Sequence, residues 1–251
     1  MNILASYRYQ MADHKKAILI FYLVIIGLFV VSGLSSALVT TGAGESYTRS
    51  VNGNEMATVI FLFVIGLCTF KETFLLSLQN GVSRKTLFSA KIVTMLSVAA
   101  IMALVDKVIG LISLAALSLT SKGVIAVTFY EGLYPAQTAN TSAFVIHLES
   151  FFFEFVLALA AMAVGYFITI MFYRLAKTGK VIVGAGVPVL CFMIIPWLDT
   201  HFFNGRLTMA FARFIVAAAC TPFRVVLTSL AVFILFSALS YLLMRKAVVK
   251  R

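Results

Sequence analysis

Long apolar stretches, each bounded by short polar segments, set the pattern of this chain. Six of these stretches approach the ~20 residues that a helix needs to cross a hydrocarbon core of about 30 Å. We therefore expect six transmembrane helices, at about residues 17–39, 56–78, 92–119, 151–173, 181–198 and 225–244. A seventh apolar stretch, Leu207 to Cys220, contains Arg213 and is too short to cross comfortably, so we expect a re-entrant or interfacial helix there.

The composition favours the same class of protein. Of the 251 residues, 62% are hydrophobic and only 12% are charged, and the mean hydropathy is +1.04. An average soluble domain carries about 25% charged residues. The sequence therefore predicts an all-α polytopic membrane protein in which residues 1–251 form a single transmembrane domain.

The positive charges predict the orientation of the helices. With six spans and a cytoplasmic N-terminus, 13 of the 20 lysine and arginine residues fall in cytoplasmic segments and five fall in outer segments. Both termini are then cytoplasmic, and the stretch from Leu207 to Cys220 lies on the outer side before the last span. The net charge of +11 is explained by topology and anionic lipid, so we expect no nucleic-acid partner.

The first 16 residues have their own periodicity. Ile3, Leu4, Tyr7 and Met11 recur at helical spacing, opposite Asn2, Ser6 and Gln10. This pattern predicts a short amphipathic helix that lies on the inner membrane surface. A secretory signal peptide is the alternative, but the apolar run that follows is longer than the 7 to 15 residues typical of such peptides.

The stretch "LQNGVSRKTLFSAK", residues 78–91, predicts a helix, a tight corner and a second short helix. Gly81 suits the left-handed position just past a helix end, and Ser83 suits the N-cap of the next helix. Val82 and Leu87 have the spacing of a hydrophobic staple. Arg84 and Lys85 then fall in a first helical turn, where the helix dipole disfavours positive charge. Either anionic lipid headgroups or an acidic groove on a partner protein would compensate them.

The longer segment "FKETFLLSLQNGVSRKTLFSAK" resembles the region between the second and third spans of small six-span permeases of the type 2 ATP-binding-cassette (ABC) transporter family, especially those of Gram-positive bacteria. The basic N-terminus, the six spans and the apolar stretch before the last span extend the resemblance over the whole chain. In that family this region is a coupling helix that contacts the ATP-hydrolysing subunit. Carried over by position, the contact residues are Glu72, Asn80, Gly81, Val82, Ser83, Arg84, Lys85, Thr86, Leu87 and Phe88.

The resemblance also implies partners and a location. Two copies of this subunit, or one copy and a related permease, would assemble with two copies of an ABC ATPase subunit in a bacterial cell membrane. ATP and Mg would bind the ATPase partner, because this chain has no GxxxxGK[ST] phosphate loop, and we expect it to be neither an enzyme nor a cofactor-binding protein. The family includes lantibiotic and antimicrobial peptide exporters, so the expected substrate is a hydrophobic or amphipathic peptide.

Four charged residues within or beside the predicted spans are candidates for polar contacts in the transport pathway or between subunits, namely Asp106, Lys107, Glu149 and Glu154. For Asp106 and Lys107 we favour the interpretation that the third span ends or breaks nearby and that both groups are hydrated. The alternative is a polar patch that faces the transport pathway or the partner subunit, with Glu149 or Glu154 as a partner for Lys107. With His147 as the one nearby histidine, we predict no metal or catalytic site.

The fifth predicted span contains Gly184, Gly186, Pro188 and Pro196. Proline removes a helical hydrogen bond, so this span is expected to kink, either as a packing element or as a place where the helix bends during transport. Cys68, Cys191 and Cys220 show no metal-binding spacing, and we expect packing residues without disulfides.

Two other functions are compatible with the sequence. A gradient-driven transporter would show inverted repeats and midplane charges, of which only Asp106 and Lys107 are candidates. The chain could instead be a non-transporting immunity or assembly factor. In that case the resemblance of residues 78–91 to a coupling helix is a coincidence.

Overall fold

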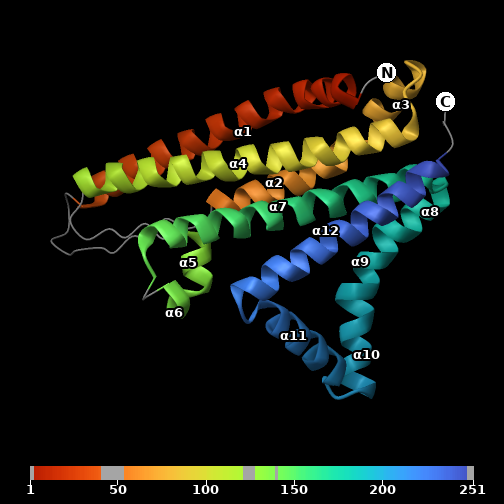
Figure 1. Cartoon of the computed structure of the whole chain (residues 1–251). Helices are drawn as coiled ribbons and strands as arrows, with labels where there is room; N and C mark the ends of the chain where they lie inside the picture. The colour runs from red at the N-terminus through yellow and green to blue at the C-terminus, as the bar shows by residue number, and fades with distance from the viewer. Residues whose placement is uncertain (1–2, 41–53, 121–127, 139–140, 248–251) are drawn as a thin grey trace.

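The computed structural model describes residues 3–40, 54–120, 128–138 and 141–247, and these residues form helices and no strand. The elements are α1 (Ile3–Thr40), α2 (Asn54–Cys68), α3 (Lys71–Gln79), α4 (Arg84–Thr120), α5 (Phe129–Leu133), α6 (Pro135–Thr138), α7 (Ala143–Arg174), α8 (Lys177–Val181), the π-helical turn η1 (Ile182–Gly186), α9 (Val187–Val189), the π-helical turn η2 (Leu190–Ile194), α10 (Ile195–Phe202), α11 (Arg206–Ala219) and α12 (Pro222–Arg245). Figure 1 shows α1, α2, α4, α7 and α12 running alongside one another, with α3 at one end and α5 and α6 at the other.

Five helices are long and apolar enough to cross a membrane: α1, α4, α7, the continuous stretch Lys177–Phe202, and α12. A sixth is obtained if α2 and α3, which meet at an angle of 43°, are counted as one broken span. The chain is therefore a helical membrane protein with five to six candidate spans. The orientation of these helices stays a prediction, and four of the basic residues behind it, Arg49, Lys122, Lys250 and Arg251, lie outside the described residues.

The start of the fourth span is eight residues earlier than predicted, because α7 begins at Ala143, and three predicted elements differ in kind from the structure. The second span is broken after Cys68, so that its last part, Lys71–Gln79, is the separate helix α3. The helix that follows the corner is not short, because α4 runs without interruption from Arg84 into the third span. The segment from residue 3 to residue 16 is not a separate interfacial helix but the first part of α1, since no proline or glycine interrupts the chain before Gly27.

The polar face of the N-terminal segment points into the protein. Ser6, Gln10 and His14 are buried, whereas Ile3 and Leu4 are exposed. The hydroxyl group of Tyr7 donates a hydrogen bond of 3.2 Å to Ser97 of α4. This stripe therefore packs α1 against α4, which is the opposite of the predicted placement on a membrane surface.

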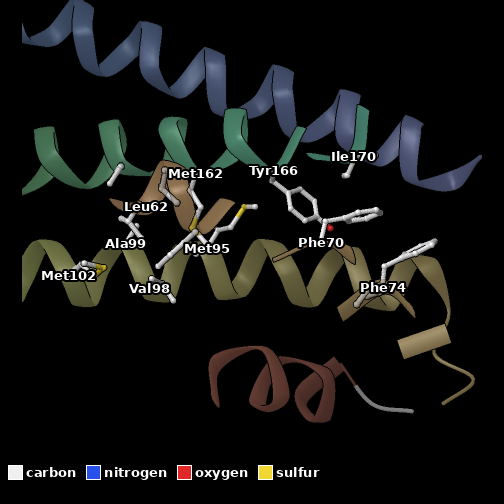
Figure 2. Packing of buried hydrophobic residues seen from close by; sticks show 14 of the residues in the cluster. Leu62, Phe70, Phe74, Met95, Val98, Ala99, Met102, Met162, Tyr166 and Ile170 are labelled. Carbon is white, nitrogen blue, oxygen red and sulfur yellow. The ribbon is translucent and has the colours of Figure 1, made fainter. Parts of the chain in front are cut away.

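The core lies where α2, α4 and α7 meet. Leu62, Met95 and Met162 come from these three helices and are fully buried (Figure 2). Close to α3, Phe70 stacks on Phe74, with ring centroids 4.9 Å apart. Tyr166 and Tyr173 of α7 contact the Phe70 ring edge-on. These rings anchor the break between α2 and α3 to α7.

Two glycines allow α2 and α7 to approach at backbone distance. A Cβ atom placed on Gly66 would lie 2.4 Å from the carbonyl oxygen of Met162, and one placed on Gly165 would lie 2.4 Å from the carbonyl oxygen of Phe63. Small residues at such crossings are a common device of membrane helices, because close approach increases van der Waals contact. The two helices therefore cross at Gly66 and Gly165.

The stretch Lys177–Phe202 contains a π-helical turn shortly before each of its prolines. The turn η1 precedes Pro188 and the turn η2 precedes Pro196. Each proline lacks an N–H group and crowds the carbonyl four residues earlier, which accounts for the local widening of the helix. The expected irregularity is thus present, although its role in transport stays a prediction.

The helix α11 is separate from the last span, as expected for the stretch Leu207 to Cys220. Its 14 residues extend about 21 Å, less than a hydrocarbon core. Asp199 holds the preceding turn, since its carboxylate accepts hydrogen bonds from the backbone N–H groups of Leu207 and Thr208. In Figure 1, α10 and α11 extend away from the other helices before α12 returns. Cys68, Cys191 and Cys220 are free thiols, but all three are exposed in this chain, so they are not the packing residues that were predicted.

Replacement of Gly66 or Gly165 by alanine should destabilise the protein by about 1–3 kcal/mol, because the added methyl group overpacks a backbone contact. Thermal unfolding of the purified protein in mild detergent would measure this. Gly110→Ala is the matched control, since a Cβ there meets nothing within 4 Å and alanine favours the helix. Equal unfolding midpoints for all three variants would contradict the close crossing.

Candidate functional site

Two regions gather polar side chains. The first is the corner, residues 71–88, which comprises α3 and the start of α4. The second is the buried network, formed by Tyr22, Asn54, Glu55, Thr58, Asp106, Lys107, Ser150 and Glu154. The corner contains the first turn of α4 and the buried network lies past its middle, about 33 Å away along the helix axis between Arg84 and Asp106.

The end of α3 has the predicted glycine cap. Gly81 has a φ of 71°, the left-handed conformation that glycine adopts without strain. Its N–H group donates to the carbonyl of Leu78, and the N–H of Val82 donates to the carbonyl of Ser77. This pair of hydrogen bonds is the Schellman motif, which satisfies the last carbonyls of α3 and reverses the chain.

The start of α4 also confirms the predicted caps. The hydroxyl oxygen of Ser83 accepts a hydrogen bond of 3.1 Å from the backbone N–H of Thr86. Val82 and Leu87, the two members of the predicted staple, are both buried in the core. The corner is therefore a fixed turn and not an open loop.

The structure explains the positive charge of Arg84 without lipid or a partner protein. The guanidinium group of Arg84 donates a hydrogen bond to the carbonyl oxygen of Arg245, the last residue of α12. A helix C-terminus carries partial negative charge, so a cation is stabilised there. The ring of Phe88 contacts that of Tyr241 of α12 at a tilted angle, with ring centroids 5.1 Å apart. The corner is thus joined to the last helix.

Burial divides the predicted contact residues into two groups. Glu72, Asn80, Gly81, Ser83 and Lys85 are exposed. Val82 and Leu87 are buried and cannot contact a partner, while Arg84, Thr86 and Phe88 are half-buried. The surface open to a partner therefore lies on α3 and the turn after it, with Leu76 as an exposed apolar residue beside Glu72.

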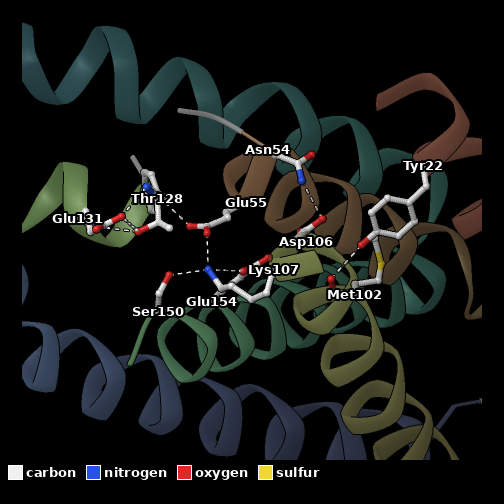
Figure 3. A network of polar contacts seen from close by, with 11 residues as sticks. Tyr22, Asn54, Glu55, Met102, Asp106, Lys107, Thr128, Glu131, Ser150 and Glu154 are labelled. Atoms are coloured by element: carbon white, nitrogen blue, oxygen red, sulfur yellow. Dashed lines mark hydrogen bonds and ion pairs between the residues drawn. The ribbon is translucent and has the colours of Figure 1, made fainter. Parts of the chain in front are cut away.

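The buried network is centred on Lys107 (Figure 3). Its ammonium group forms an ion pair with Glu55 of α2, donates a hydrogen bond to Ser150 of α7 and lies 3.4 Å from a carboxylate oxygen of Glu154. The second oxygen of Glu55 accepts a hydrogen bond of 2.9 Å from the backbone N–H of Phe129. One lysine therefore joins α2, α4 and α7, and Glu55 adds the start of α5.

Asp106 is 2% exposed and lies in an unbroken helix, so the interpretation of a broken, hydrated third span is wrong. It accepts a hydrogen bond of 2.9 Å from the side chain of Asn54. Its carboxyl group also faces Glu154, Thr58 and Tyr22. Tyr22 itself donates a hydrogen bond of 2.9 Å to the carbonyl of Met102. The polar patch faces the interior of this subunit.

Of the two glutamates suggested as partners for Lys107, only Glu154 takes that role. Glu149 instead accepts a hydrogen bond of 2.7 Å from the hydroxyl group of Tyr130 in α5. Burial and this hydrogen bond raise the pKa of the Tyr130 phenol above its usual range. In the described part of the chain, no group of three His, Cys, Asp or Glu side chains is arranged to hold a metal ion.

A second buried lysine lies near the break between α2 and α3. Lys91, which the charge count assigned to a cytoplasmic segment, is 3% exposed. Its ammonium group donates a hydrogen bond of 2.8 Å to Thr69 and lies 3.4 Å from His14. It also lies 5.4 Å from the centre of the Tyr166 ring, a cation–π contact. Lys91 thus ties α1, α4 and α7 to the break.

Sequence patterns missed Glu55, Ser150 and Tyr22. Glu55 comes just before an apolar run, and a carboxylate at that position is usually interpreted as a helix-end residue that faces water. Ser150 and Tyr22 lie in apolar stretches and are ordinary span residues by composition. A weak signal was available in retrospect, since a lysine inside an apolar bundle is often paired with a carboxylate and Glu55 is the one acidic residue of α2.

Replacing Arg84 with alanine should lower the free energy of unfolding by about 1 kcal/mol, because α12 loses the cation at its C-terminus. Chemical denaturation in mixed micelles would measure the change. Lys85→Ala serves as the control, since Lys85 is exposed in the same helical turn. If the two variants unfold alike, Arg84 does not hold the end of α12.

Comparison of this chain with protein-family models, with curated proteins and with solved structures found no match in any of the three.

Proposed function

We propose that this chain is the membrane subunit of an ABC exporter that moves a hydrophobic or amphipathic peptide. The corner carries this proposal: a short helix, α3, ends in a fixed turn and leaves Glu72, Asn80 and Lys85 exposed. A partner surface with complementary charge can bind these side chains without disturbing the buried anchors Val82 and Leu87. The ATPase subunit, which would hold ATP and Mg, is the expected partner.

The contacts of the corner support a transmission role. The start of α4 is joined to α12 through Arg84 and Phe88, and α3 is joined to α7 through Phe70 and Phe74. A displacement of α3 by a partner would therefore act on three long helices at once. Because α4 is continuous over 37 residues, the same displacement would be felt at the opposite end of the bundle.

The exposed apolar surface supports assembly with a second permease subunit. None of the most apolar part of Lys177–Phe202 is buried within one chain. Phe192 is 85% exposed and Met193 is 71% exposed, and the neighbouring helix α11 is exposed along its length. Lipid would cover part of this surface, and a second subunit would complete a pathway between the two copies. A peptide substrate would then meet mainly apolar side chains.

A gradient-driven transporter is the second candidate, and the buried network is the observation that favours it. Glu55, Asp106 and Glu154 place three carboxylates inside the bundle, as ion-coupled transporters often do. Transport by the chain alone in vesicles, driven by an ion gradient and without ATP, would distinguish this candidate from the exporter.

The exporter proposal predicts that a triple variant, Glu72→Ala with Asn80→Ala and Lys85→Ala, retains the fold but captures the ATPase subunit at least about tenfold less well, a loss of about 1.4 kcal/mol. Affinity purification from native membranes, followed by mass spectrometry and an ATP hydrolysis assay, would measure the capture. Gln137→Ala is the control, because Gln137 is exposed at the opposite end of the bundle.

Two outcomes would contradict the proposal. In the first, the wild-type chain captures no protein with a phosphate-binding loop even after cross-linking. In the second, the triple variant and the Gln137→Ala control capture the ATPase subunit and stimulate its activity equally.

A further inference from the structure

The buried network contains more negative than positive groups. Glu55, Asp106 and Glu154 each carry a carboxyl group, and Lys107 carries the one ammonium group that contacts them in the described structure. Among the described residues, the phenol of Tyr22, from α1, also faces Asp106 and Glu154. If every carboxyl group were ionised, three negative charges would face one positive charge in an apolar bundle.

Hydrogen bonds are distributed unevenly among the three carboxyl groups. Glu55 pairs with Lys107 and accepts a hydrogen bond from the backbone N–H of Phe129. One oxygen of Asp106 accepts from Asn54, whereas its other oxygen has no donor among the described residues. Glu154 is 1% exposed, and neither of its oxygens has a hydrogen-bond donor in this part of the chain. The shortage of donors falls on Asp106 and Glu154.

These two carboxyl groups face each other from α4 and α7. Two adjacent buried carboxylates repel, and Lys107, which lies 3.4 Å from Glu154, divides its one positive charge between Glu154 and Glu55. A carboxylic acid, by contrast, has an O–H group that can donate to a neighbouring carboxylate. A single proton between the two groups supplies the missing donor and removes one of the unpaired charges.

We propose that Asp106 and Glu154 bind one exchangeable proton between them at neutral pH. The proton enters from water and returns to water, and no other bond forms or breaks. Its release leaves two carboxylates that push α4 and α7 apart and attract water into this end of the bundle. Protonation therefore favours the closed packing of these helices. The inference does not depend on the exporter proposal, since it concerns contacts within one chain.

Infrared spectroscopy of the purified full chain in lipid nanodiscs tests the proposal. At neutral pH the wild-type protein should show the C=O stretching band of a protonated carboxyl group, shifted in heavy water. The band should disappear with rising pH in a step that releases one proton. It should be absent from both Asp106→Asn and Glu154→Gln, because either replacement leaves the other carboxylate without its negative neighbour.

Glu149→Gln is the matched control for these spectra. Glu149 lies on α7 five residues before Glu154 and contacts Tyr130 instead of the network, so this variant should keep the band. If the network variants fail to fold, the pH titration of the wild-type protein still tests the proposal, because it requires no substitution.

Three results would overturn the proposal. The first is a wild-type spectrum without the band at neutral pH, with equal thermal stability in sodium chloride and in choline chloride. The second is a band that survives in one of the two network variants, which would place the proton on a single carboxyl group. The third is a missing band with thermal stability that rises in sodium chloride but not in choline chloride of equal ionic strength, which would assign the pair to a sodium ion.

Discussion

Charged side chains inside an apolar bundle must find opposite charges or polar groups within the protein, because neither lipid nor packed hydrocarbon offers them donors or acceptors. Lys107 meets this requirement by binding groups on α2 and α7 at once. Asp106, also on α4, accepts a hydrogen bond from Asn54 of α2 and faces Tyr22 of α1. The positions of four of the long helices relative to one another follow from these pairs together with the close crossing at Gly66 and Gly165.

The helix α4 links the two polar regions of the molecule. Its first turn belongs to the corner, where Arg84 holds the end of α12, and its centre carries Asp106 and Lys107. The straight path between them passes Lys91, which joins α4 to His14 and Thr69. A partner that binds the exposed side of α3 would thus act on a helix whose far part is fixed by ion pairs. This arrangement is suited to the transfer of motion from one end of the bundle to the other.

Local features could be predicted from the sequence and distant ones could not. The glycine cap at Gly81 and the N-cap at Ser83 depend on residues within one helical turn, so the sequence contains all that is needed to recognise them. Apolar length likewise indicated the membrane helices. The break after Cys68 was missed because aromatic rings from α7 hold it, and those rings come from a remote part of the chain.

The same reason explains the errors at the charged sites. Asn54 and Asp106 are 52 residues apart in sequence, and Arg84 and the carbonyl of Arg245 are 161 residues apart. A single sequence does not show which distant groups will be in contact. The sequence therefore predicted that water surrounds Asp106 and that lipid or a partner protein compensates the charge of Arg84. The division of the corner into exposed and buried residues also depends on α12, which the local pattern does not include.

Site-specific cross-linking in native membranes would determine whether the exposed side of the corner binds an ATPase subunit, as proposed. A photoreactive amino acid placed at Asn80 would lie on the exposed turn, and the same group at Gln137 would lie at the opposite end of the bundle. If the corner binds this subunit, position 80, and not position 137, should form an adduct with a soluble ATP-binding protein. Adducts of position 80 with lipid alone, or equal adducts from both positions, would contradict it.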